Sequence, residues 1–265
     1  MKLVNIDHFI NKKTSNKAIF DYCMSIRGEI FKATKGRTVY RFAHGDRSYF
    51  IKIHTGVGWR EIFKNLFQGK WPVLGAENEW KALMRLKALG LNTLAPVAMG
   101  VRGLNPALQQ SFIITEELRD TVSLEWLATQ ALPVFIKRAL IVTLANVMRI
   151  MHEGGVNHRD CYLCHFRLYM PKGIAALDAQ HLILYVIDLH RAQIRKKVPM
   201  RWRVKDIAGL VFSSKVLELT RGDKMRFIAA YTGVTARKAL REQQVFWQAV
   251  HNASNTLYQK QQRKK

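Results

Sequence analysis

The sequence predicts an α+β fold with two lobes, a small antiparallel β-rich N-terminal lobe followed by a mainly helical C-terminal lobe. Two observations lead to this prediction. Short runs of β-branched and aromatic residues, separated by turn sequences, occur N-terminal to Glu116. Longer stretches with apolar residues at helical spacing dominate the remainder of the chain. The chain has 265 residues, of which 48% are hydrophobic, so it is long and apolar enough to bury a substantial core.

The predicted N-terminal lobe begins with a three-strand antiparallel meander. Its strands are expected at 31–33, 38–43 and 48–54, separated by the turn sequences 35–37 and 44–47. A helix is predicted over 75–89, because Leu83, Leu86 and Leu89 form an apolar stripe and Gly90 is a suitable end. A strand at 111–115 and a polar hinge at 116–119 complete this lobe.

In the C-terminal lobe a long helix is predicted over 133–152, ending at Gly154 and Gly155. An apolar strand at 182–187 ends at Asp188, and the pattern is helical from Lys205 onward. The end of the chain is polar and basic, and we expect it to be frayed. The predicted organisation is an N-terminal extension (1–27), an N-terminal lobe (28–116), a C-terminal lobe (117–254) and a basic tail (255–265).

The charge indicates an acidic partner. Lys and Arg number 43 against 19 Asp and Glu, a net charge of +24. Nucleic acid, an anionic membrane, a phosphorylated substrate and an acidic protein all fit this charge. Apolar stretches fall short of the roughly 20 residues that a membrane span requires, and Asp7 and His8 make the N-terminus a poor signal peptide. Three cysteines cannot all pair with one another, so we expect a reduced, cytoplasmic protein.

The most informative segment contains His158-Arg159-Asp160, between the long helix and the strand that ends at Asp188. The tripeptide is a weak signal alone, but its context is much more specific. The surrounding elements occur in the order found in protein kinases. This order is a strand lysine, a helix glutamate, a hinge, a long helix, His-Arg-Asp and an apolar strand that ends in Asp. The sequence therefore predicts a protein-kinase-like fold that uses ATP and Mg²⁺.

Each of these positions has a physical task in phosphoryl transfer. Lys52, on a rigid strand, can hold the α- and β-phosphates. Glu79, which is favoured over the nearby Glu77, can orient that lysine. Asp160 can accept the proton of the attacking hydroxyl. Asp188 can hold Mg²⁺, which prefers oxygen ligands. We therefore expect Asp160 as the catalytic base and Asp188 as the metal ligand.

A closer resemblance covers the chain from about Gly28 to about Phe227. The sequence resembles the bacterial lipopolysaccharide core heptose(I) kinases, a branch of the kinase-like superfamily. The segments that carry the resemblance are 60–66 (REIFKNL), 72–80 (PVLGAENEW), 103–106 (GLNP), 111–116 (SFIITE), 157–162 (NHRDCY), 186–195 (VIDLHRAQIR), 198–206 (VPMRWRVKD) and 212–214 (FSS).

The resemblance implies ATP-dependent phosphorylation of the first heptose of the lipid A–core at the cytoplasmic face of the inner membrane. It supports the same roles for Lys52, Glu79, Asp160 and Asp188, and gives Asp206, near the start of a helix, a structural role. His158 is expected to pack the catalytic loop. Acyl carrier protein is implied as a candidate partner.

The sequence also departs from the protein-kinase pattern. It has no glycine-rich loop, so the turn at Lys35 and Gly36 and the hinge residue Glu116 are the expected nucleotide contacts. His165 stands where protein kinases carry a metal-binding Asn. Because imidazole is a poor Mg²⁺ ligand, a second metal site at His165 stays open.

Basic residues follow the metal loop, on the acceptor side of a kinase site. We expect them to bind the anionic glycolipid acceptor and the anionic membrane surface. These residues are Arg191, Arg195, Lys196, Arg201 and Arg203.

Several alternatives stay open at this point. His158, Cys161, Cys164 and His165 have passable zinc spacing, but they interleave with Asp160 and lack a second Cys/His pair, so buried inert thiols are favoured. The segment 59–71 is amphipathic and either docks on a membrane or partner or packs on the small lobe. A different acceptor (another core sugar or protein tyrosine) and a non-enzymatic basic binding protein are the alternative functions. Nucleic acid is not expected, because we find no nucleic-acid motif.

Overall fold

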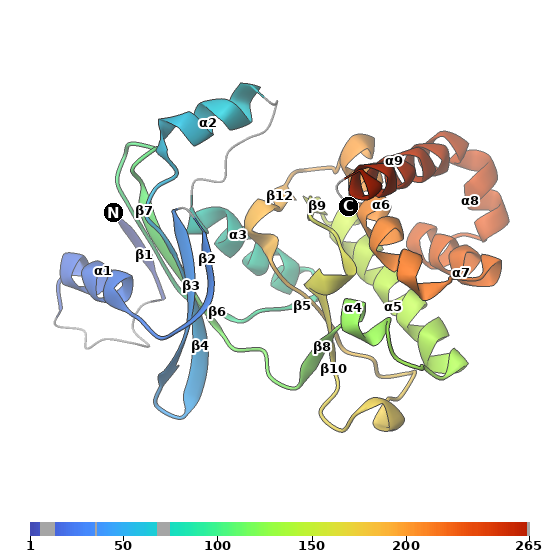
Figure 1. The fold of residues 1–265 in the computed structure, drawn as a ribbon, viewed down its shortest axis with the longest axis horizontal. Helices are drawn as coiled ribbons and strands as arrows, with labels where there is room; N and C mark the ends of the chain where they lie inside the picture. Colours follow the sequence, from blue (N-terminus) through green and yellow to red (C-terminus); the bar gives the residue numbers. More distant parts are fainter. Residues whose placement is uncertain (6–13, 35, 68–74, 264–265) are drawn as a thin grey trace. The chain divides into compact units, whose positions relative to one another are not determined.

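The computed structural model describes residues 1–5, 14–34, 36–67 and 75–263, except for the side chain of Asn65. These residues form two compact units, which are described separately below. The first unit comprises residues 1–84 and 94–118, and the second comprises residues 85–93 and 119–265. Figure 1 shows the helices and strands of both units.

An antiparallel sheet is the centre of the first unit. Within the described residues its strands follow the order β1-β6-β7-β4-β3-β2. The elements of this unit are β1 Lys2–Val4, α1 Asn16–Ser25, β2 Glu29–Thr34, β3 Arg37–His44, β4 Arg47–His54, α2 Gly58–Phe67, β6 Pro96–Arg102, β7 Gln110–Glu116 and the part of α3 Ala76–Ala88 that ends at residue 84; the last four residues of α3 are assigned to the second unit. The predicted meander is β2, β3 and β4. The pairing of β1 with β6 adds a strand from the predicted N-terminal extension.

The core of this unit lies between the sheet and α1. Phe20 and Cys23 of α1 are fully buried against Ile51 and Phe112 of the sheet, and the rings of Phe20 and Phe112 lie 5.5 Å apart. Burying side chains of this size contributes about 2 kcal/mol each. This packing makes the central strands β4 and β7 rigid supports for the side chains that they carry.

Helix α2 contains the described part of the amphipathic segment predicted at 59–71; Lys70 and Trp71 lie outside the described residues. Ile62 is buried, whereas Phe63 is half exposed and Phe67 is 90% exposed. Trp59 stacks on Phe63, with the ring centroids 5.8 Å apart. The helix therefore packs through one side and leaves aromatic side chains on its surface.

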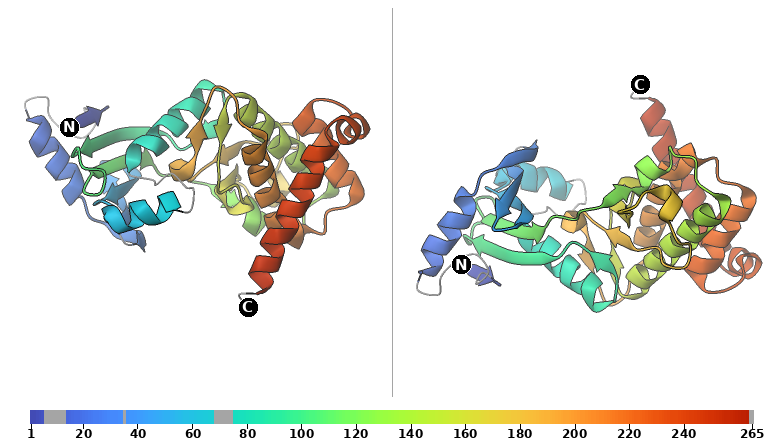
Figure 2. Two further views of the ribbon diagram at one scale, coloured as in Figure 1. Left: turned by 90° about the horizontal axis from the view of Figure 1, so that it is seen from above. Right: turned by 90° about the horizontal axis from the view of Figure 1, so that it is seen from below.

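The second unit is mainly helical. Its elements are β5 Asn92–Thr93, β8 Thr121–Ser123, α4 Leu124–Leu127, α5 Val134–Glu153, β9 Val156–Asn157, β10 Phe166–Tyr169, β11 Leu184–Val186, β12 Gln193–Ile194, α6 Met200–Ser213, α7 Arg221–Thr232, α8 Ala236–Glu242 and α9 Gln244–Gln262, with 3₁₀ turns at Leu163–His165, Ile174–Ala176, Leu189–Arg191 and Ser214–Leu217. Helix α5 packs against α7, and α6 packs against α9 (Figure 2).

Two expectations for this unit were wrong. The helical pattern expected from Lys205 onward is confirmed. Its first helix begins earlier, at Met200, directly after Pro199, so Asp206 lies in the middle of α6 and not near its start as expected. The expected frayed end at 255–265 is helical as far as Gln262, because α9 packs Phe246, Val250 and Ser254 into the core. No helix in the described ranges has the length and apolar character needed to cross a membrane.

Candidate active site

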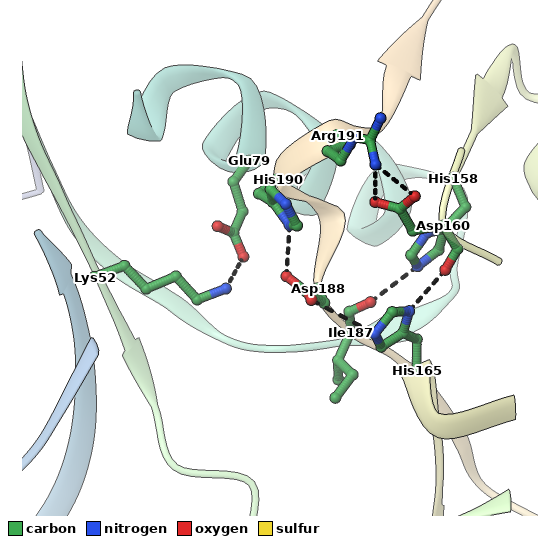
Figure 3. Close-up of polar contacts among 9 residues, drawn as sticks. All are labelled: Lys52, Glu79, His158, Asp160, His165, Ile187, Asp188, His190 and Arg191. Atoms are coloured by element: carbon green, nitrogen blue, oxygen red, sulfur yellow. Dashed lines mark hydrogen bonds and ion pairs between the residues drawn. The ribbon is translucent and has the colours of Figure 1, made fainter. Parts of the chain in front are cut away.

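Lys52 and Glu79 form an ion pair in the first unit. Lys52 lies on the central strand β4, where it is paired with Val39 of β3 and Ile113 of β7. Its Nζ lies 2.6 Å from Oε1 of Glu79, and the Glu79 side chain is 1% exposed (Figure 3). Glu79 is in the first turn of α3, where the helix dipole favours a carboxylate. The structure therefore brings together the lysine and the glutamate that the sequence predicts as a pair.

Three further residues, Lys35, Gly36 and Glu116, are predicted to contact the nucleotide. Lys35 lies outside the described residues. Gly36 has φ +78, and a Cβ at this position would lie 2.6 Å from the Gly56 carbonyl oxygen, so the turn requires glycine. Glu116 ends β7, donates its backbone N–H to Ala95 and pairs its carboxylate with Arg47 at 3.1 Å. The nucleotide contacts of these residues stay predictions.

Asp160 is held by Arg191 in the second unit. The Nη1 atom of Arg191 lies 2.9 Å from Oδ1 and 3.1 Å from Oδ2 of Asp160 (Figure 3). Arg191 lies in the turn that follows Asp188, and the side chains of Arg191 and Asp160 are 33% and 18% exposed. The antiparallel pairing of β12 with β9 holds the segments next to these two residues side by side. The carboxylate is thus oriented and still accessible to a substrate.

Asp188 follows β11 in a left-handed backbone conformation, with φ +59. Its Oδ1 lies 2.6 Å from Nδ1 of His190, and its Oδ2 lies 3.5 Å from Nε2 of His165 (Figure 3). Burial opposes the charged form of His165, but hydrogen bonds to Cys164 and to the Asp160 carbonyl raise its pKa to about 9. The raised pKa favours the charged form of His165, which pairs with Asp188 and is not a metal ligand in that form. Its role as a metal ligand stays untested.

Asp206 organises the loop that carries Asp160. Its carboxylate is fully buried and accepts the backbone N–H groups of His158 at 2.6 Å and Arg159 at 2.8 Å. His152 Nε2 lies 3.3 Å from the same carboxylate, and His152 Nδ1 lies 2.8 Å from the Tyr231 hydroxyl. Burial raises the pKa of Tyr231 to about 12. This network holds the backbone on the N-terminal side of Asp160.

His158 packs inside the loop. It is fully buried, and its Nε2 lies 2.9 Å from the Ile187 carbonyl, next to Asp188. Its ring stacks on that of His165, with centroids 5.5 Å apart. Burial lowers the pKa of His158 below its usual value, so the neutral ring donates to Ile187. His158 therefore connects the Asp160 loop to the Asp188 loop.

The cysteines near Asp160 are mostly enclosed. Cys161 is buried, with its Sγ 3.6 Å from the Met148 sulfur, and burial raises the pKa of its thiol well above the usual range. Across the described parts of the chain, no cluster of three or more His, Cys, Asp and Glu side chains is arranged to hold a metal ion.

The predicted acceptor residues have different surroundings. Arg195 donates to Asn157 at 2.8 Å, and Lys196 and Arg201 are exposed. Arg203 donates to the Tyr231 hydroxyl at 2.9 Å and packs over the rings of Tyr231 and Phe246. Arg203 is thus committed to an internal contact.

Several residues at this site were missed at the sequence level. They are His152, Arg159, His190, Trp202 and Tyr231. His190 lies two residues after Asp188, so its spacing could have indicated it, whereas the others come together only through tertiary packing.

Comparison with known proteins gives consistent matches. Residues 22–231 match the model of the lipopolysaccharide kinase (Kdo/WaaP) family. The lipopolysaccharide core heptose(I) kinase WaaP of Pseudomonas aeruginosa is 44% identical over 248 residues, which are 92% of this chain and 91% of that protein. WaaP of Escherichia coli K12 is 42% identical over 94% of both chains.

A solved structure of WaaP in complex with acyl carrier protein is also similar. It is 38% identical, has a TM-score of 0.81, and the match covers 97% of this chain and 100% of that one. The predicted two-lobed kinase-like α+β fold is confirmed by this match together with the β-rich and helical units.

Proposed function

Because the chain belongs to the lipopolysaccharide kinase (Kdo/WaaP) family, we propose that it transfers phosphate from ATP to the first heptose of the lipopolysaccharide inner core. The observation that carries this proposal is its identity of 42–44% with heptose(I) kinases over most of both chains. The arrangement of charged side chains in each unit agrees with phosphoryl transfer, which depends on positioning and neutralisation of charge.

The proposed ATP contacts begin with Lys52, whose ammonium group holds the phosphates. Glu79 fixes the direction of that ammonium through the 2.6 Å contact. The turn at Gly36 and the side chain of Glu116 at the hinge are further proposed contacts, and Lys35 is a candidate from the sequence alone. Because Lys52 lies on the rigid strand β4, its ammonium group loses little conformational freedom when ATP binds.

Asp188 fits Mg²⁺ through its carboxylate oxygens, which are partly exposed. Mg²⁺ commonly binds one or two carboxylates together with substrate phosphates, so a single aspartate is a sufficient protein ligand. When bound, the metal would neutralise charge on the phosphates. Asp188 would hold it, with His190 orienting the carboxylate.

Asp160 is the proposed general base that accepts the proton of the heptose hydroxyl. Arg191 holds both carboxylate oxygens of Asp160. Asp206 accepts the backbone N–H groups of His158 and Arg159, the two residues before Asp160. Both contacts limit the freedom of the base before the acceptor arrives. Preorganisation of this kind lowers the barrier of a positioned proton transfer.

The test is transfer of labelled phosphate from ATP to purified core lipopolysaccharide that lacks phosphate on the first heptose. Asp160→Asn should lower the rate at least about 10²-fold, the contribution typical of a general base. The matched control is Asp178→Asn, since Asp178 is exposed. It should retain the wild-type rate. Full activity of Asp160→Asn, or labelling of protein tyrosine in place of the glycolipid, would contradict the proposal.

We also propose that the protein works as a peripheral protein at the cytoplasmic face of the inner membrane. The support is the acceptor, which is anchored in a membrane, the net charge of +24 and the exposed aromatic side chains of α2. Flotation with anionic vesicles tests this. Phe67→Ser should weaken flotation, and equal flotation of wild type and variant would remove α2 from the proposal.

Acyl carrier protein is the proposed protein partner. The support is the similar structure of WaaP in complex with acyl carrier protein and the basic character of this chain, which suits an acidic partner. Co-elution of the two purified proteins in gel filtration at low salt tests it. Separate elution under those conditions would contradict this part of the proposal.

A further inference from the structure

Four cationic side chains surround the indole ring of Trp202 in the second unit. Arg159, Arg201 and Arg195 place their guanidinium carbons 5.2, 5.3 and 5.7 Å from the ring centroid. Lys205 places its Nζ at 5.7 Å. We call Arg159, Arg195, Arg201 and Lys205 the Trp202 cation cluster.

Three segments of the chain build this cluster. Arg201 and Lys205 lie beside Trp202 on α6, and Lys205 is one turn after it. Arg159 lies in the catalytic loop in a left-handed conformation, with φ +73, and its backbone N–H is fixed by Asp206. Arg195 follows β12, and its backbone N–H is bonded to Gly155 at 2.8 Å. Backbone hydrogen bonds therefore hold the segments that carry Arg159 and Arg195, and α6 carries the exposed side chains of Arg201 and Lys205.

The cluster carries more positive charge than its neighbours balance. Desolvation and then Arg191 lower the pKa of Arg159 and of Lys205, while Asp160 and Asp206 only partly offset them. Desolvation and then Arg201 lower the pKa of Arg195. Contact with the indole ring compensates for part of this repulsion. A bound anion would remove much of the remaining repulsion between the cations.

Two further observations point to an anionic ligand. Arg159 is only 5% exposed, and its Nε finds no hydrogen-bond acceptor among the described residues. A buried donor without an acceptor is costly, so a ligand that supplies one is favoured. In addition, Arg201 lies in the first turn of α6, where the helix dipole disfavours a cation and favours an anion.

Arg191 joins this cluster to the proposed base. It acts electrostatically on Arg159 and Lys205, and its Nη1 bonds both carboxylate oxygens of Asp160. Arg159 also directly precedes Asp160 in the chain, so the cluster and the proposed base share one loop. Because Asp160 is proposed to receive the proton of the acceptor hydroxyl, a molecule that carries both the hydroxyl and the anionic group would be recognised at both points.

We propose that the Trp202 cation cluster is a subsite for an anionic group, a carboxylate or a phosphate, of the glycolipid acceptor. This inference rests on the proposed function, because it takes the acceptor to be a lipopolysaccharide core. It adds Arg159, Lys205 and Trp202 to the acceptor site and makes the negative charge of the acceptor a condition of efficient transfer.

The first test compares two double variants that each remove two positive charges. Arg201→Gln/Lys205→Gln changes the cluster, and Lys197→Gln/Lys238→Gln changes exposed lysines outside it. We expect the cluster variant to raise the KM for core lipopolysaccharide about tenfold, as the loss of charge-assisted hydrogen bonds predicts. The kcat and the KM for ATP should stay within about twofold. An unchanged acceptor KM, an equal effect in the control, or a change confined to the KM for ATP would overturn the proposal.

The second test measures inorganic phosphate binding to the wild-type protein and both double variants by isothermal titration calorimetry, without ATP or acceptor. Binding by wild type and the control but not by the cluster variant supports the subsite even where heptose transfer fails. Equal binding by all three overturns it. Failure of the proposed function and failure of this inference are therefore distinguishable.

The source of the anion is found with two modified acceptors, one with its phosphates removed and one with its carboxylates methyl-esterified. The modification that abolishes the difference in KM between wild type and the cluster variant identifies the group bound. A difference that survives both modifications overturns the subsite.

Discussion

Arg191 donates through a single nitrogen to both carboxylate oxygens of Asp160, at 2.9 and 3.1 Å, although the two residues are 31 positions apart in the chain. The segment that carries Arg191 also carries Asp188, the proposed metal ligand. Orientation of the proposed base and position of the metal loop are thus coupled through one side chain. This coupling makes Arg191 a positioning residue.

The first prediction concerns Arg191→Gln. We expect kcat to fall about tenfold, because Asp160 loses the contact that orients it, while the KM for ATP stays unchanged. Steady-state kinetics with varied ATP and core lipopolysaccharide provide the measurement. Arg191→Lys keeps the charge but not the planar geometry, and should fall between wild type and Arg191→Gln. A rise in kcat for Arg191→Gln would show instead that the contact inhibits the enzyme.

The second prediction concerns the pair Lys52–Glu79. Glu79→Leu leaves Lys52 without its buried partner, so we expect a loss of about 3 kcal/mol in the free energy of unfolding. Lys52→Met/Glu79→Leu removes both charges, and its loss should be smaller than that of Glu79→Leu alone. Urea denaturation of the variants tests this. All of these variants should lack kinase activity, because none retains an oriented ammonium group.

The double variant tests the pair in two ways, through its free energy of unfolding and through its kinase activity. If the double variant were less stable than Glu79→Leu, the pair would contribute net stability in addition to its proposed role with ATP. If the double variant kept activity, Lys52 would not hold the phosphates.

The third prediction compares the contributions of Asp206 and Tyr231 to the free energy of unfolding. Asp206→Asn should lower the free energy of unfolding by about 3 kcal/mol, because a buried carboxylate that accepts two backbone N–H groups is lost. Tyr231→Phe removes one hydroxyl in the same network and should cost about 1 kcal/mol. Thermal unfolding measures both. Equal costs would contradict the view that the carboxylate, and not the surrounding ring packing, holds the loop.

The fourth prediction concerns cysteine reactivity. Burial raises the pKa of Cys23 to about 12 and that of Cys161 well above its usual range, so both thiols stay protonated and enclosed. Cys164 is half-buried. At pH 8, iodoacetamide should modify Cys164 in the folded protein and all three thiols in urea, as read by mass spectrometry. Cys164→Ser should give almost no labelling when folded. Fast labelling of Cys23 in the native protein would contradict the packing of α1.

The Lys52–Glu79 contact could be predicted from the sequence because each residue lies in an element with a clear pattern. The order of elements in protein kinases predicts a strand lysine and a helix glutamate, and the spacing from Glu79 to the leucine stripe of α3 favoured Glu79 over Glu77. Asp160 and Asp188 were identified in the same way, by their order along the chain. The functional roles of these residues stay predictions until the variants are tested.

The Trp202 cation cluster could not be predicted in this way. Arg159, Arg195 and Lys205 come from separate segments, and their meeting depends on the pairing of β9 with β12 and on the carboxylate of Asp206. The basic run also concealed the start of α6, because its charged residues weaken the apolar periodicity that marks a helix. Likewise, β1 pairs with β6 across a long stretch of chain, and no local pattern reports such a pairing.

The last prediction concerns pH and the start of α7. Asp223 and Thr220 form a capping box, with hydrogen bonds of 3.1 Å in both directions, and Asp223 also pairs with Lys137 of α5 at 3.2 Å. Burial raises the pKa of Asp223, but hydrogen bonds from Thr220 and Lys137 outweigh it and leave the pKa below its usual value. Its contribution is therefore fully present above the unfolded-state pKa of about 4 and is lost as pH falls through the lower folded-state value.

Asp223→Ala should accordingly cost about 1–2 kcal/mol at pH 7, as for other helix caps, and the difference from wild type should shrink below about pH 4. Urea unfolding at pH 7, 5 and 3 measures it. Asp46→Ala, in the exposed turn between β3 and β4, is the control and should show no comparable dependence on pH. A constant difference between wild type and Asp223→Ala at all three pH values would mean that packing, and not the ionised cap, holds α7 to α5.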